Sequence, residues 1–86
     1  MVTLIMMVED QRNITCGGDP FNYLKSTLKG LAFQLEPGQD VKVLLLKEKF
    51  PFGREVYEGL ARTSKFKLVD LQENNGEIAV ILRKTQ

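Results

Sequence analysis

The stretch DPFNYLKSTLKGLAFQLEPG, residues 19–38, decides the fold because it holds the start, the core-facing stripe and the end of one helix. Asp19 is typical of an N-cap, and Pro20 of a first helical residue, where its missing N–H costs nothing. Proline and glycine at Pro37 and Gly38 end the helix. Apolar residues recur between these signals at the three-four spacing of a buried helix face: Phe21, Leu24, Leu28, Leu31, Ala32 and Leu35.

Shorter patterns surround this helix. Residues Val2–Val8 are almost all apolar, which predicts a buried strand, and residues 13–18 predict a loop. After the helix, apolar runs separated by turn residues predict four more elements. In chain order these are a strand at Val41–Lys47, a second helix at Arg54–Ser64, a strand at Phe66–Leu71 and a last strand at Ile78–Lys84. Asn75-Gly76 indicates a hairpin, although the polar residues around this pair leave open a loop longer than two residues.

The expected order is therefore β-α-β-α-β-β within a single domain, residues 1–86. Each strand-helix-strand step is expected to cross over right-handed and to leave its two strands parallel, while the last two strands pair antiparallel. Both helices then lie on one face of a four-stranded mixed sheet. The fold class is α+β, a two-layer α/β sandwich.

Composition excludes several classes of function. Twelve basic residues are scattered among eleven acidic ones, so the sequence disfavours nucleic-acid binding. With no histidine and one cysteine, the usual metal-ligand sets and the His-based catalytic triads cannot form within the chain. No glycine-rich phosphate loop has the required spacing. We therefore expect neither a metal nor a cofactor.

The lone cysteine and the N-terminal residues indicate a compartment. One cysteine cannot form an internal disulfide, which favours a reducing environment. The opening MVTLIMMVED lacks the basic region and cleavage site of a signal peptide and is too short to span a bilayer. We expect a soluble cytoplasmic protein that has no membrane partner.

Cys16 is the candidate reactive residue because it stands three residues before the proposed N-cap. A helix N-terminus carries partial positive charge, which stabilises a thiolate and lowers its pKa. Gly17 and Gly18 give the chain freedom to turn the sulfur toward that end or toward a partner. Asp19 opposes this effect, since its charge competes for the same N–H groups. The alternative is that Cys16 is a small, inert apolar residue.

Around this cysteine the chain resembles the TusA/SirA family of small sulfur-carrier proteins, whose members begin with a pattern close to L-D-x-x-G-L-x-C-P-x-P. Asp10 matches the acidic residue of that pattern, Ile14 matches its hydrophobic residue, and Asn13 stands at its glycine. The Pro-Gly turn at residues 37–38 and the final segment NNGEIAVILRK, residues 74–84, also resemble the family.

The resemblance implies a fold and a function. The family has the β-α-β-α-β-β fold, which is also seen in the C-terminal domain of a translation initiation factor. It implies that Cys16 accepts sulfur as a persulfide from a protein donor and passes it to a protein acceptor, a carrier rather than an enzyme with turnover. The C-P-x-P motif is degenerate: Gly17 and Asp19 stand at the two proline positions, and Pro20 comes one residue late.

Three further residues are candidates for contact with a partner. Phe50 and Phe52 flank a proline in a loop, where they either form an exposed docking patch or cap the core beneath the second helix. Lys25 belongs either to a basic face near the cysteine or to a solvated surface. The second hypothesis for function is a non-catalytic binding or regulatory module on the same scaffold, with an incidental Cys16. The sequence does not determine the oligomeric state.

Overall fold

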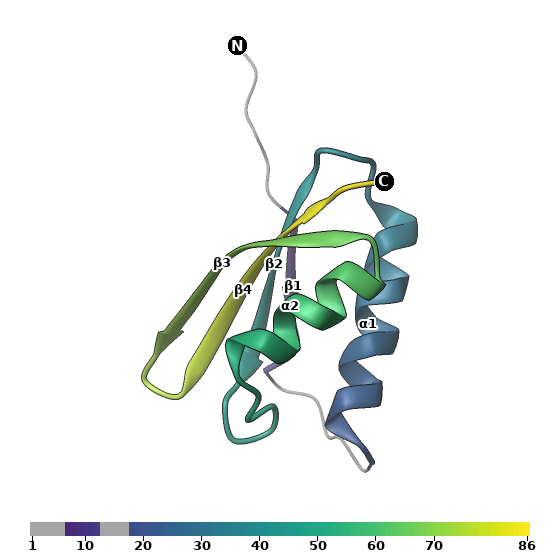
Figure 1. Ribbon diagram of the computed structural model, residues 1–86. Coiled ribbons are helices and arrows are strands. Elements are labelled where there is room, and N and C mark those ends of the chain that lie inside the picture. Colours follow the sequence, from purple (N-terminus) through teal and green to yellow (C-terminus); the bar gives the residue numbers. More distant parts are fainter. Residues whose placement is uncertain (1–6, 13–17) are drawn as a thin grey trace.

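The structure, a computed structural model, describes residues 7–12 and 18–86 and has the expected β-α-β-α-β-β order (Figure 1). The expected N-terminal strand falls largely on residues 1–6, outside the described residues. The six elements are β1 (Met7–Asp10), α1 (Pro20–Gln34), β2 (Asp40–Leu46), α2 (Arg54–Thr63), β3 (Phe66–Asn74) and β4 (Glu77–Lys84). The fold class inferred from the sequence is confirmed.

Helix α1 begins and ends where its signals predict. Asp19 has extended backbone angles and caps the helix, and Pro20 is its first residue. The helix ends at Gln34, and Gly38 then adopts a φ of 92°, which favours glycine. Leu24, Leu28, Leu31 and Leu35 are buried as expected. Phe21, predicted to be part of the same buried face, is instead 39% exposed, because it lies in the first turn at the rim of the core.

The sheet has the strand order β1-β2-β4-β3, so β4 lies between the two strands that flank α2. β1 and β2 are parallel, and β4 runs antiparallel to both β2 and β3. The directions of the strands are therefore as predicted. The described part of β1 is an edge strand rather than a fully buried one, and Val8 is 54% exposed.

The β3–β4 hairpin has the tightest of the expected turns. Asn74 pairs with Glu77, which leaves only Asn75 and Gly76 in the turn. Both turn residues have positive φ, 52° and 78°, as a type I′ turn requires. An irregularity in β3 between Leu68 and Asp70 moves the register by one residue.

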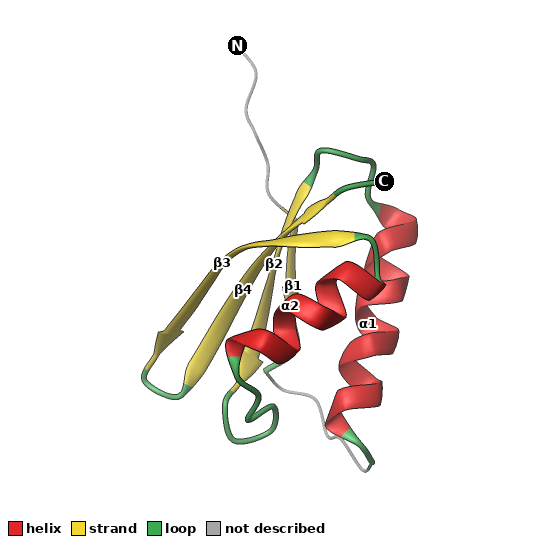
Figure 2. Cartoon of the chain, in the orientation of Figure 1, coloured by secondary structure: helices red, strands yellow, loops and turns green. Residues whose placement is uncertain are grey.

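The two helices cover one face of the sheet, and no described helix covers the other (Figure 2). The core between the layers takes its buried side chains from both helices and from alternate positions of β2 and β4. Tyr57, Leu60 and Ala61 form the buried face of α2. Neither described helix is long and apolar enough to cross a membrane.

Candidate functional site

The candidate site is the segment around Cys16, and the residues on either side of it form defined polar and helix-capping contacts. Cys16 and Gly17 lie outside the described residues, which stop at Arg12 and resume at Gly18. Gly18 is exposed, and α1 begins two residues after it. The structure thus defines the chemistry on each side of residues 13–17.

On the C-terminal side, both carboxylate oxygens of Asp19 are engaged in starting α1. Oδ1 accepts a hydrogen bond from the backbone N–H of Phe21 at 2.9 Å, and Oδ2 accepts one from the side-chain amide of Asn22 at 3.0 Å. These bonds satisfy one of the unpaired N–H groups of the first turn. Asp19 is exposed, so it also brings a negative charge to this helix end.

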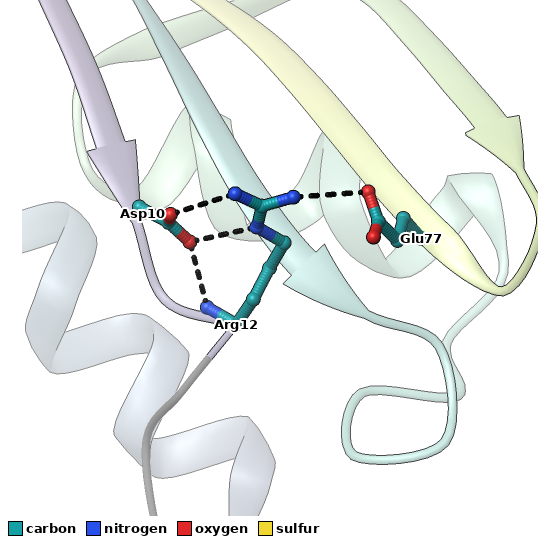
Figure 3. A network of polar contacts seen from close by, with 3 residues as sticks. All are labelled: Asp10, Arg12 and Glu77. Carbon is teal, nitrogen blue, oxygen red and sulfur yellow. Dashed lines mark hydrogen bonds and ion pairs between the residues drawn. The ribbon is translucent and has the colours of Figure 1, made fainter.

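On the N-terminal side, Arg12 connects the end of β1 to the start of β4 (Figure 3). Its guanidinium lies between two carboxylates, with Nη2 at 2.9 Å from Oδ2 of Asp10 and Nη1 at 3.1 Å from Oε1 of Glu77. The backbone N–H and Nε of Arg12 also donate to Oδ1 of Asp10, each at 3.0 Å. The side-chain hydrogen bond from Arg12 lowers the pKa of Asp10 to about 2. The ion pairs fix the backbone where β1 ends.

A second group of polar side chains lies between β1 and α1. The hydroxyl of Tyr23 donates to Oε1 of Gln11 at 3.0 Å, and Nε2 of Gln11 donates to the carboxylate of Glu9 at 2.5 Å. The backbone N–H of Gln11 donates to the carbonyl of Leu44 at 2.9 Å, so the residue extends the β1–β2 ladder. Gln11 is only 9% exposed. This group joins the first turns of α1 to the sheet edge.

The aromatic residues near the start of α1 form one cluster, which tests the predicted docking residues. Phe50 is completely buried and belongs to the core, so its side chain cannot contact a partner and the docking prediction is wrong for it. Phe52 is partly buried. The centroid of its ring lies 6.1 Å from the ring centroid of Phe21 and 6.0 Å from that of Tyr57. Burial raises the pKa of Tyr57 to about 12, and its hydroxyl donates to the carbonyl of Phe50 at 2.8 Å.

The remaining candidate, Lys25, is half-exposed on α1, and the described residues include no ion pair for it. Within residues 7–12 and 18–86, no group of three or more potential metal ligands lies together. The structure therefore brings Phe52 together with Phe21 and Asp19 together with Pro20, but it does not join Lys25 to either pair.

Several residues of this region were missed by sequence reasoning. The sequence contained only a weak signal for the ion pair of Arg12: this basic residue lies two positions after Asp10, beyond the end of the predicted strand. Glu77 had none, since it is 65 residues from Arg12 in the chain. Tyr23 was not in the predicted apolar stripe, and nothing in the sequence pairs it with Gln11.

Comparison with known proteins identifies the fold and not the family. No family model matches the sequence, and no curated protein matches it. The fold is similar to the solution structure of HP1264 from Helicobacter pylori, with a TM-score of 0.64 and 12% sequence identity over 94% of this chain and 100% of that chain. At this identity the likeness concerns only the arrangement of helices and strands.

Proposed function

We propose that the chain is a sulfur carrier in which Cys16 accepts sulfur from a donor protein and passes it to an acceptor. The observation that carries the proposal is that α1 begins at Pro20, four residues after Cys16 in the sequence, and has Asp19 as its N-cap. A helix N-terminus favours a thiolate, the form of cysteine that attacks sulfur. The β-α-β-α-β-β fold and the resemblance to TusA/SirA proteins agree with this function.

The proposed relay needs no oxidant or cofactor. The thiolate of Cys16 attacks the outer sulfur of the donor persulfide, forming a new S–S bond as the bond to the donor sulfur breaks. The donor leaves as a thiolate, and Cys16 becomes the persulfide. The acceptor thiolate then attacks the outer sulfur of the Cys16 persulfide and forms a new S–S bond. The bond to the Cys16 sulfur breaks, and Cys16 leaves as a thiolate. Because a lone thiol suits a reducing compartment, we propose that the relay operates in the cytoplasm.

A transfer experiment tests the relay. The protein is treated with a small-molecule persulfide that carries isotopically heavy sulfur, freed of excess reagent, and mixed with an acceptor peptide that contains one thiol. We expect the heavy sulfur to appear on the peptide only when the wild-type protein was loaded. The matched control is Cys16→Ser, which removes the thiol and keeps the size of the side chain. Equal transfer by wild type and control would contradict the proposal.

The second candidate function is a non-catalytic binding module, favoured by the sheet face that no described helix covers. Leu44 and Ile81 are half-buried on this face, and Val8 lies at its edge with 54% of its surface exposed. Apolar residues on such a face are available to a partner. This function predicts that Cys16→Ser has no effect on partner binding, whereas the carrier function predicts loss of transfer.

A further inference from the structure

A hollow of about 340 Å³ lies at the C-terminal ends of the two helices. Lys29 and Phe33 of α1 line one side, Ser64 and Lys65 line another directly after α2, and Lys84 of β4 lies beneath the end of α1. The end of α1 and the C-terminus of the chain are at the same end of the molecule (Figure 1). The volume suits a small metabolite.

The ammonium of Lys84 is a buried cation without a carboxylate partner among the described residues. The residue is 8% exposed, and Nζ donates to the carbonyl of Ala32 at 2.5 Å and to that of Leu35 at 3.1 Å. An ammonium has three donors, and the described residues supply no acceptor for the third. Burial of a charge is costly unless it is paired, so an anion in the adjoining hollow would be favoured.

Basic residues are concentrated around this hollow although the whole chain is nearly neutral. A neighbouring hollow between the end of α2 and the start of β3 shares Lys65 and adds Arg62 and Lys67. Together the two hollows are lined by five of the twelve basic residues and by one of the eleven acidic residues. That acidic residue, Glu58, is already in an ion pair with Arg54 at 3.0 Å.

The negative ends of the helices explain part of this distribution. Cations near a helix C-terminus are stabilising, which accounts for Lys84 and for Arg62 in the last turn of α2. It does not account for Lys29, which lies more than one turn before the end of α1, or for Lys67 in β3. The basic charge therefore exceeds what the two helix ends require.

Two other side chains of the hollow lack the contacts that their chemistry favours. Phe33 is 93% exposed, the most exposed of the large apolar side chains that the structure describes. The hydroxyl of Ser64 is buried and has no hydrogen-bond partner within the described residues. A buried polar group without a partner is rare in folded proteins, and such a group often accommodates a water molecule or an ion. The exposed ring of Phe33 therefore favours a bound molecule in the hollow, whereas the Ser64 hydroxyl has almost no accessible surface and does not contact a molecule there.

We propose that this hollow binds a small organic oxyanion that carries a flat apolar ring. Lys29, Lys65 and the third N–H of Lys84 hold the phosphate or carboxylate group, and the ring lies against Phe33. The hollow is at the C-terminal end of α1, and the N-terminal end of this 15-residue helix, which follows Cys16 in the sequence, is about 22 Å away. The proposal is therefore independent of the sulfur-carrier function.

An NMR titration with phenyl phosphate tests the proposal on the intact chain. We expect saturable shifts in the backbone amides that line the hollow, above all those of Phe33, Ser64 and Lys65. Inorganic phosphate, which has the charge without the ring, should shift the same amides with a dissociation constant at least fivefold higher. Phenol, which has the ring without the charge, should produce no saturable shift there.

Variants separate the two halves of the site. Phe33→Ala should raise the dissociation constant for phenyl phosphate about fivefold and leave that for inorganic phosphate unchanged. Lys29→Ala should raise both constants about fivefold. The matched control is Lys42→Ala, which removes one positive charge from β2, outside both hollows, and should change neither constant.

These substitutions are at exposed or half-exposed positions, so the amide spectra should show that each variant is folded. Shifts scattered over lysines elsewhere, an equal response to phenol, or equal weakening by Lys42→Ala would overturn the proposal. The absence of any saturable shift with phenyl phosphate would do the same.

Discussion

Tyr57 provides a sharp test of the packing that supports the start of α2 and the aromatic cluster. It is 2% exposed, and its hydroxyl donates to the carbonyl of Phe50 at 2.8 Å. Tyr57→Phe removes this hydrogen bond without changing the shape of the ring. Because the carbonyl of Phe50 keeps the backbone N–H of Phe52 at 2.8 Å, the expected loss at neutral pH is about 1 kcal/mol of unfolding free energy.

The same residue predicts a pH dependence of stability. Burial raises the pKa of Tyr57 from its usual 10.0 to about 12, so above pH 10 the unfolded state releases the phenolic proton first. Its contribution is fully present below pH 10 and is lost as the pH rises toward 12. At about pH 11 the wild type should have lost about 1.4 kcal/mol through this group. Phenylalanine does not titrate, so the two stability curves should meet near that pH.

Urea unfolding followed by circular dichroism at intervals from pH 7 to pH 11 measures both effects. Every other ionisable group is common to the two proteins, so the difference between the two curves isolates the contribution of Tyr57. A difference that stays constant across this range would refute the reasoning, because Tyr57 would then titrate alike in the folded and unfolded states.

Three further predictions concern Asp19 and Asp10, which lie on either side of Cys16 in the sequence, and Ser64, which lines the hollow. Asp19→Ala should lower the unfolding free energy by about 1 kcal/mol through loss of the α1 cap, as measured by urea unfolding; no change would show that the cap is dispensable. Asp10 should titrate by NMR with a midpoint near 2 in the wild type, because Arg12 lowers its pKa, and much closer to the usual 3.8 in Arg12→Ala. The stability that this carboxylate contributes should be present above about pH 4 and fall as the pH approaches 2. Ser64→Ala should raise the unfolding free energy by about 1 kcal/mol because it removes a buried hydroxyl without a partner among the described residues; a loss of stability would show that the hydroxyl is satisfied.

The elements could be predicted from the sequence because their signals are local. Asp19, Pro20 and Gly38 define the ends of α1 by the backbone angles and hydrogen bonds that each residue favours. Asn75 and Gly76 do the same for the hairpin, since both adopt the positive φ of its turn. The position of β4 between β2 and β3 was not predicted, because strand order depends on the packing of the whole sheet.

The candidate sites were only partly predictable for the same reason. Phe50 and Phe52 are two residues apart in one loop, yet one is completely buried and the other lies partly exposed beside Phe21. The pairing of Arg12 with Glu77 and the gathering of lysines around Lys84 join residues distant in the chain. Charge scattered along the sequence thus becomes concentrated only after folding.

The central claim is that Cys16 is a nucleophile that takes up sulfur, and the intact mass of the folded protein tests it most directly. After incubation with a persulfide donor and removal of the reagent, the wild type is predicted to gain the mass of one sulfur atom. Peptide mapping should assign the gain to Cys16, and Cys16→Ser should gain nothing. A folded wild-type protein whose mass is unchanged by the donor would contradict the account.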